Sequence, residues 1–420
     1  MNASRDARFA RGAKLLAAGA AIALMATACG GSNGAGTGGG NGGGGDGEAL
    51  KLGSLLPTTG ALAFLGPPEI AGVDLAIKEI NEAGGVNGQD VQIVHRDSGD
   101  TTTNIATQST TDLLGQGVSA IIGAASSGVS KTVINQITGE GTIMFSPANT
   151  SPDFTDWDDD NLYWRTAPSD VMQGRILGNF MVSQGAANVG MIVLNDAYGT
   201  GLASNIKTAV EEAGGQIVAE PMFNEGDSQF SAQVDDVVAA NPDAIAVISF
   251  DQSKQIIPLL IQKGISPEQL YFVDGNLSDY SADFDPGTLE GAWGTQPGSF
   301  AKDDFKARLA EVDDSLEVWN YAGESYDATI LIALAAVAGG GTDARTIADN
   351  LVAVSRDGEK CNDFASCKAL LDEGKDIDFD GISGPISFSD KGDVSEGIMG
   401  IYQYDGDNVP QPIQEEEGSI

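Results

Sequence analysis

Two stretches of small hydroxylated residues could together bind an anion. Ser126 and Ser127 follow the apolar run 120–123 and precede a segment, 128–138, that we expect to be helical, and Thr150 follows the next predicted strand. The first backbone N–H groups of a helix have no partner inside it, and the helix dipole favours an anion in front of them. We therefore predict that Ser127 and Thr150 hold a small carboxylate. The alternative is that Ser126 or Ser127 only caps the helix and Thr150 only fills a turn.

An acidic residue, Asp274, stands at the end of another predicted strand, 270–273, directly before Gly275. A carboxylate there could bind a ligand ammonium group, which is too costly to bury without a partner. An Asp-Gly pair is also common in simple turns, so that role stays open. If the strand ends converge, hydroxyl and N–H donors on one side and Asp274 on the other suit a free amino acid.

Enzyme chemistry is poorly supported by the residue types present. The single histidine, His95, falls inside a predicted strand, and no Gly-x-Ser-x-Gly motif surrounds Ser126 and Ser127. A serine–histidine triad and a histidine-ligated metal are therefore not expected. No carboxylate pair stands out by its spacing among the 60 acidic residues. We predict a binding protein that is not an enzyme and carries no cofactor or metal.

The chain of 420 residues is strongly acidic, with 22 basic and 60 acidic residues and a formal net charge of -38. Binding to nucleic acid or to an anionic membrane surface would need a basic face, so neither is expected. No loop has the spacing of an EF-hand calcium site. We interpret the charge as a solvated acidic surface, of a kind that keeps a protein soluble in a saline medium.

The N-terminus has the pattern of an export signal. A basic start leads into the apolar run 15–25, which is too short to span a bilayer. The sequence Ala-Thr-Ala-Cys at 26–29 resembles a bacterial lipobox, although Ala26 replaces the usual larger aliphatic residue. We predict a signal peptide at 1–28, lipidation of Cys29 and a glycine-rich tether through residue 48. The lipid would be the only membrane anchor, on the outer face of the cytoplasmic membrane.

The two remaining cysteines, Cys361 and Cys367, are six positions apart. In an exported protein this spacing predicts a local disulfide. A metal site there is disfavoured, because no third ligand lies nearby.

Beyond the tether, apolar strands alternate with amphipathic helices. Strands are expected at 50–56, 91–95, 120–123, 189–194, 216–219, 244–249, 270–273, 291–295, 383–388 and 398–404, and helices at 69–83, 102–114, 128–138, 171–184, 199–213, 230–240, 254–263, 302–312, 325–338 and 344–354. This α/β alternation predicts parallel sheets covered on both faces. The number of units suggests two doubly wound lobes, with any ligand at the carboxyl ends of the strands.

Eight motifs spread along the chain carry a family resemblance. They are LLPTTG at 55–60, INEAGGVNG at 80–88, IGAASS at 122–127, SPANTSP at 146–152, RTAPSD at 165–170, DAYGTG at 196–201, FSAQV at 230–234 and GPISF at 384–388. Taken together, they resemble the periplasmic solute-binding proteins of the branched-chain amino-acid type, which serve ABC importers. The similarity runs through nearly all of residues 50–405.

The resemblance implies roles for particular residues. In such relatives, the residues equivalent to Ser127 and Thr150 hold the ligand carboxylate, and the backbone at the equivalent of Ala148 helps to bind the ammonium. Asp274 would bind the ammonium from the second lobe, and Tyr198 would close over the ligand.

Other predicted ligand contacts follow the family pattern less closely. Phe64 and Leu65 occupy a loop where relatives often place a large aromatic residue beside the ligand. Relatives often present tyrosines around the position of Phe250, which is here the only aromatic residue of its segment. Ser126, and Asp170 near the rim of the site, complete the predicted set.

The implied fold is that of the type I periplasmic binding proteins, with two Rossmann-like lobes joined by three crossovers. We predict that lobe 1 comprises 49–167 and 298–388, and that lobe 2 comprises 168–297 and 389–420. The implied function is capture of a branched-chain or other small neutral amino acid by a monomer, for delivery to an ABC permease. Alternatives are the same fold binding a short amide, urea or an aromatic acid, or a ligand-sensing subunit.

Overall fold

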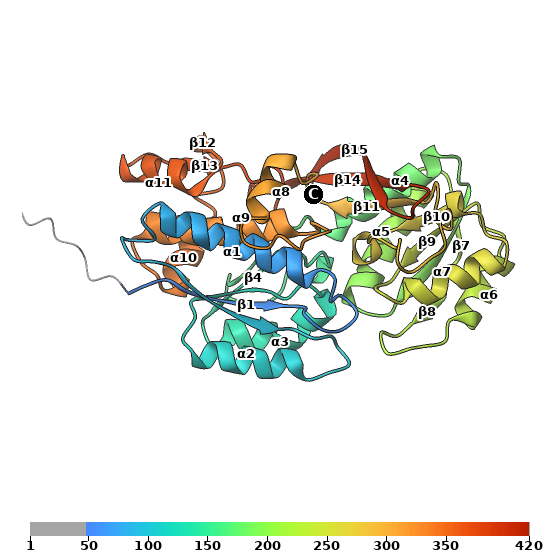
Figure 1. Cartoon of the computed structure of the whole chain (residues 1–420), viewed down its shortest axis with the longest axis horizontal. Coiled ribbons are helices and arrows are strands. Elements are labelled where there is room, and N and C mark those ends of the chain that lie inside the picture. Colours follow the sequence, from blue (N-terminus) through green and yellow to red (C-terminus); the bar gives the residue numbers. More distant parts are fainter. Residues whose placement is uncertain (1–47, 420) are drawn as a thin grey trace, which may run out of the picture. The chain divides into compact units, whose positions relative to one another are not determined.

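The computed structural model describes residues 48–419, and Figure 1 shows their arrangement. The predicted signal peptide, Cys29 and the tether up to residue 47 lie outside the described residues. Within 48–419, two principal sheets are each flanked by helices. We call the part built on the first sheet lobe 1 and the part built on the second sheet lobe 2.

Lobe 1 is built on a 5-stranded parallel sheet in the order β2-β1-β3-β4-β5. Its strands are β1 (Lys51–Leu56), β2 (Gln92–Asp97), β3 (Ala120–Gly123), β4 (Ile143–Ser146) and β5 (Tyr163–Arg165). Its larger helices are α1 (Gly66–Glu82), α2 (Ile105–Gly115), α3 (Ser127–Gly139) and α9 (Ala322–Gly339). Alternate residues of β3 enter different cores: Ile122 packs with α1 and α9, whereas Ile121 packs with α2 and α3. Figure 1 shows these two helix layers on opposite faces of the sheet.

Lobe 2 is built on an 8-stranded sheet in the order β15-β14-β11-β10-β9-β6-β7, with β8 also pairing with β6. Its strands are β6 (Asn188–Leu194), β7 (Gln216–Ala219), β8 (Met222–Phe223), β9 (Ala244–Ile248), β10 (Leu270–Phe272), β11 (Trp293–Pro297), β14 (Glu396–Tyr404) and β15 (Pro410–Ser419). Within this sheet β14 pairs in an antiparallel manner with both β11 and β15, and the other strand pairs are parallel. Its helices are α4 (Asp170–Ser183), α5 (Ala197–Glu212), α6 (Ser231–Ala239) and α7 (Ser253–Gln262).

The chain passes between the two sheets three times within the described residues. The first crossover follows β5, the second lies between β11 and α9, and the third precedes β14. The predicted α/β fold of two lobes joined by three crossovers is therefore confirmed. Shorter elements are α8 (Asp303–Leu309), α10 (Ala344–Leu351), α11 (Phe364–Asp372), β12 (Glu359–Cys361), β13 (Ile377–Phe379) and the 3-10 turns η1 (Pro152–Phe154), η2 (Pro267–Gln269) and η3 (Asp274–Asn276).

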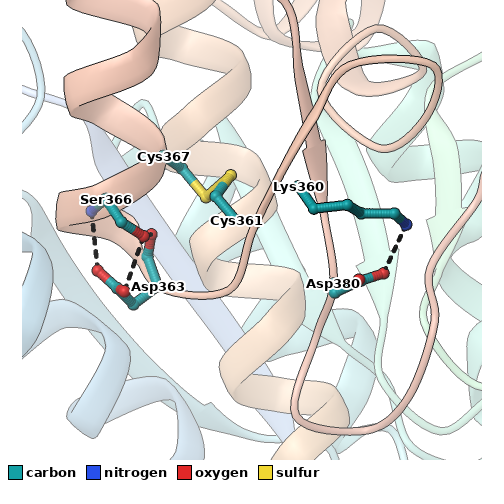
Figure 2. Close-up of a disulfide and its surroundings, with 6 residues drawn as sticks. All are labelled: Lys360, Cys361, Asp363, Ser366, Cys367 and Asp380. Carbon is teal, nitrogen blue, oxygen red and sulfur yellow. Dashed lines mark hydrogen bonds and ion pairs between the residues drawn. A yellow bond between two sulfur atoms is a disulfide. The ribbon is translucent and has the colours of Figure 1, made fainter.

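The predicted disulfide is present. Cys361 and Cys367 are bonded, with their Cα atoms 5.3 Å apart, and the bond joins the end of β12 to α11 (Figure 2). Asp363 caps α11 by accepting a hydrogen bond of 2.8 Å from the backbone N–H of Ser366. Lys360 pairs with Asp380 at 2.8 Å on the other side of the bond. The disulfide thus closes a small unit formed by β12, α11 and β13.

Several short elements, among them β5, β8, β12, β13 and α11, were not expected, and two larger corrections lie near the C-terminus. The predicted strand at 383–388 forms only isolated bridges at Pro385 and Phe388, because Gly384 adopts a φ of +135° that breaks the extended run. Conversely, β15 was not expected, since it contains prolines and several acidic residues. Backbone hydrogen bonds to β14 hold it in the sheet, so the strand forms although its side chains have a low β-propensity.

No single helix in residues 48–419 is long and apolar enough to cross a membrane. Only α9 and α10 taken together reach the necessary length and composition, and they are bent by 101° at their break. Most of α9 is buried in the core of lobe 1.

Candidate functional site

A small cavity, of about 250 Å³ including its open mouth, lies between the lobes. Lobe 1 contributes Leu62, Leu65, Ala125, Ser126, Ser127 and Ala148; lobe 2 contributes Phe250, Asp274, Gly275 and Tyr198; and the second crossover contributes Tyr321. Most of the residues predicted to bind the ligand therefore line one space. No lysine, arginine or histidine is among these lining residues.

The lobe 1 wall of the cavity consists of two loops that are bonded to each other. The hydroxyl of Ser146 donates to the carbonyl of Ala124 at 2.7 Å. The amide nitrogen of Asn149 donates to the carbonyls of Ala124 and Ala125, at 3.0 and 2.7 Å. Gly123 has a φ of +128°, and a Cβ there would collide with the carbonyl oxygen of Leu55, so only glycine fits this turn. The loops are held in place without a ligand.

Ser126 and Ser127 play different parts at the start of α3. Ser126 is the N-cap, and its Oγ accepts a hydrogen bond of 3.3 Å from the backbone of Val129. The capping alternative is therefore correct for Ser126. The Oγ of Ser127 accepts a bond of 3.3 Å from the backbone N–H of Ser151, which leaves its hydroxyl proton free to donate to a ligand.

Thr150 is buried, and its Oγ1 has no hydrogen-bond partner among the described residues. An unpaired hydroxyl is costly to bury, so a ligand atom would relieve that cost. Thr150 itself is not among the residues that line the cavity.

A fully buried arginine shapes the turn around Thr150. Arg165 donates through Nη1 to the carbonyls of Asn149 and Ser151, at 3.2 and 2.8 Å, on either side of Thr150. Its Nε pairs with Asp393 of the third crossover at 2.5 Å. Arg165 thereby links the turn around Thr150 to the third crossover between the lobes. The sequence identified Arg165 only as part of a motif.

Asp274 faces this wall from lobe 2, where it begins η3. Its Oδ1 accepts a hydrogen bond of 2.7 Å from the hydroxyl of Tyr198, and its Oδ2 accepts one of 2.6 Å from the hydroxyl of Tyr321. Burial raises the pKa of Asp274 above its ordinary value, although the two tyrosine bonds act in the opposite direction. The charged form therefore gains from a bound cation.

Tyr321 is a site residue that the sequence did not reveal. It adopts a left-handed conformation with a φ of +58°, which is unusual for a large non-glycine residue. Such a conformation has no clear sequence signal, because it depends on the crossover that holds it. Tyr198, which was predicted, stacks on Phe250 with ring centroids 5.6 Å apart.

Besides Thr150, two further predicted contacts do not line this cavity. Asp170 was expected near the rim, but it is fully buried at the start of α4, and neither carboxylate oxygen has a hydrogen-bond partner in the described part of the chain. Burial and the nearby charge of Asp274 raise the pKa of Asp170 well above its ordinary value, although the neighbouring Thr150 hydroxyl acts in the opposite direction. Phe64 lines a neighbouring cavity together with Phe250 and Lys254, and not the cavity of Asp274.

The two lobes contact each other near the cavity. The hydroxyl of Ser151 donates to the carbonyl of Ala197 at 2.9 Å, and the backbone N–H of Thr101 donates to Glu225 at 3.3 Å. His95 bonds to Ser54 and Asp74 at 2.7 and 2.9 Å, away from this region. The two lobes therefore close around a small cavity that has both polar and apolar walls.

The periplasmic binding protein family matches residues 49–408, which is most of the chain. The chain belongs to this family. Members of the periplasmic binding protein family are substrate-binding proteins and not enzymes, and they act outside the cytoplasm. The relatives place the chain with the branched-chain amino-acid type.

Three similar proteins illustrate the range of the family. The chemotactic signal transduction system substrate-binding protein BasB of Halobacterium salinarum is 26% identical over 355 residues, covering 82% of this chain and 84% of BasB. LivJ of Streptococcus pneumoniae, solved in complex with isoleucine, has a TM-score of 0.72 at 23% identity and covers 89% of this chain and 100% of its own. A solute-binding protein of R. palustris, solved with benzoate, has a TM-score of 0.71 at 18% identity and covers 89% and 98%.

Proposed function

We propose that this periplasmic binding protein captures a small neutral amino acid and delivers it to the permease of an ABC importer. The observation that carries the proposal is the pair of tyrosine bonds that aim the Asp274 carboxylate into the cavity, opposite Ser127 and Ala148. A buried carboxylate facing hydroxyl and helix N-terminal donors matches the two charges of an amino-acid head group. Lipidation at Cys29 would keep the protein beside its permease.

The head group would bind in two halves. The ligand carboxylate would accept hydrogen bonds from the Ser127 hydroxyl, the first N–H groups of α3 and Thr150 Oγ1, which lacks a partner within the described residues. The ammonium would pair with Asp274 and donate to the backbone carbonyl of Ala148. Closure of the lobes removes water from both halves, and this strengthens each charged interaction.

The rest of the cavity favours an aliphatic side chain. Leu62, Leu65 and Phe250 provide its apolar surface. An acidic amino acid would bury a second carboxylate with no basic partner among the lining residues. We therefore expect leucine, isoleucine, valine and alanine to bind better than aspartate or glutamate.

Thermal-shift screening against the amino acids, urea, short amides and benzoate tests the proposal. Aliphatic amino acids should raise the melting temperature by mass action. Asp274→Asn should abolish that response, whereas Asp285→Asn, an exposed acid of the same lobe, should leave it unchanged. A response to benzoate or urea with none to any amino acid would overturn the amino-acid assignment.

A second candidate is a ligand-sensing subunit, favoured by the similarity to BasB, a substrate-binding protein of a chemotactic signal transduction system. Both candidates use the same cavity, so ligand binding alone does not separate them. The loaded protein should stimulate ATP hydrolysis by its cognate permease in proteoliposomes if it serves import. Ligand-dependent association with a transducer, without such stimulation, would favour the sensing role.

A further inference from the structure

A larger cavity lies at the second crossover, next to the amino-acid site. It encloses about 950 Å³ including its open mouth, and α8, α9, β11, β14 and β15 border it. Its walls include five aromatic residues: Phe300, Phe305, Trp319, Tyr321 and Tyr402. The proposed function makes no use of this space.

Tyr321 separates the two cavities. Its side chain is among the lining residues of both, and its hydroxyl is bonded to Asp274 on the amino-acid side. The larger cavity contacts residues of lobe 1, lobe 2 and the crossover between them. A ligand there would therefore touch the segment that connects the lobes.

Two buried polar groups in the wall of this cavity lack partners. Glu324 is only 4% exposed, and its carboxylate makes no hydrogen bond to another residue within 48–419. Gln296 is 5% exposed; its Oε1 accepts a bond of 2.8 Å from Asn320, but its Nε2 has no partner among the described residues. Buried polar groups normally have partners, so an acid that no other residue bonds and an unpaired amide in the wall of one cavity indicate a ligand.

The charges around the space favour a cation. Three acids line it, namely Glu324, Glu317 and Asp279, against a single lysine, Lys306. The ammonium of Lys306 lies 4.1 Å from the ring centroid of Trp319, so that ring already accepts a cation on its face. Aromatic rings and an unpaired carboxylate together are the features that recognise an organic ammonium group.

We propose that this cavity is a second binding site, for a small organic cation with an apolar body. The ammonium group would pair with Glu324, and the apolar body would lie against Phe300, Trp319 and Tyr402. The Gln296 amide would donate to an acceptor atom where the ligand carries one. The site would be occupied independently of the amino-acid cavity.

Three probes of similar size and different charge test the proposal: benzylamine, benzyl alcohol and benzoate. Calorimetry on the purified protein should show that benzylamine binds at least about tenfold more tightly than benzyl alcohol, and that benzoate does not bind at this site. Glu324→Gln should weaken benzylamine by at least about tenfold. Glu317→Gln, an exposed acid at the same cavity, is the matched control and should change affinity by less than about threefold.

Variants in the other cavity locate the cation. Asp274→Asn should leave benzylamine binding intact, and Trp319→Leu should weaken it even if Glu324→Gln proves poorly folded by circular dichroism. Loss of benzylamine binding in Asp274→Asn with retention in Glu324→Gln would place the cation in the amino-acid cavity and overturn the proposal. Equal affinity for benzyl alcohol, or no binding of benzylamine to the unmodified protein, would also overturn it. Titration of the same preparation with amino acids tests the first cavity separately.

Discussion

Asp274 is a buried acid whose two oxygens are held by tyrosines from different parts of the chain. Tyr198 lies in α5, and Tyr321 lies at the end of the second crossover. The bonds orient the carboxylate, and they lower its pKa against the larger effect of burial. The geometry of the proposed ammonium site therefore depends on hydroxyl groups that do not need to touch the ligand.

Tyr321→Phe should weaken amino-acid binding about tenfold. The change removes one hydrogen bond to a charged group, which contributes about 1.5 kcal/mol, and it leaves the ring in place. Isothermal titration calorimetry with the best aliphatic amino acid measures the effect. Tyr326→Phe is a suitable control, because it removes a hydroxyl from the same region of α9 that bonds to Glu79 and not to Asp274. Equal losses in both variants would contradict the role assigned to Tyr321.

At the scale of elements, the binding turn depends on β5 and on the third crossover. Arg165, the last residue of β5, bonds to the backbone on both sides of Thr150 and to Asp393. A short edge strand thus connects the carboxylate half of the site to a connection between the lobes. The small unit closed by Cys361 and Cys367 lies apart from the residues that line the ligand cavity.

Arg165→Gln should destabilise the protein by about 3 kcal/mol, because it leaves the buried Asp393 without its partner. It should also weaken amino-acid binding, since the turn at Thr150 loses two hydrogen bonds. Urea unfolding and calorimetry measure the two effects. Arg345→Gln, which breaks a more exposed ion pair with Asp160, should change stability by well under 1 kcal/mol. A similarly small effect of Arg165→Gln would show that the buried pair does not support the turn.

Replacing Cys361 and Cys367 together by serine should lower stability by about 2 kcal/mol, as expected for a short closed loop. Amino-acid affinity should stay the same, because the disulfide lies outside the cavity lining. Denaturation with and without reductant, followed by ligand titration, provides the measurement. Loss of affinity in the double variant would mean that this unit supports the cleft.

At the scale of the whole molecule, acids dominate both the surface and several buried positions. Burial raises the pKa of Glu324 to about 8, that of Asp196 to about 7 and that of Asp327 to about 6. Burial also raises the pKa of Glu69 and of Asp170 well above their ordinary values. The folded protein therefore binds more protons than the unfolded chain between the ordinary carboxyl pKa and about pH 8.

Stability should consequently fall as the pH rises through this window. A group whose pKa is higher in the folded state contributes stability below its unfolded pKa and loses it above its folded pKa. We expect a melting temperature several degrees higher near pH 5 than near pH 8. Repeating the pH 8 measurement in high salt provides the control, since salt screens the surface charge of a -38 chain but not the buried acids. A melting temperature that rises with pH would contradict the conclusion that burial disfavours the charged form of these acids.

The sequence alone predicts the alternation of elements, the two-lobed fold and most of the residues that line the cavity between the lobes. These features have short-range signals: apolar strands, helix periodicity, and small or acidic residues at strand ends such as Ser127 and Asp274. Other features become visible only in the folded structure. The hydroxyl of Tyr321 bonds to Asp274, Asp170 is buried with no hydrogen bond to its carboxylate oxygens within residues 48–419, and Phe64 lines another cavity. The pairing of β15 with β14 is a further such feature. The physical reason is that burial, backbone pairing and hydrogen-bond partners depend on which distant segments the crossovers bring together, whereas propensity and periodicity depend only on neighbours along the chain.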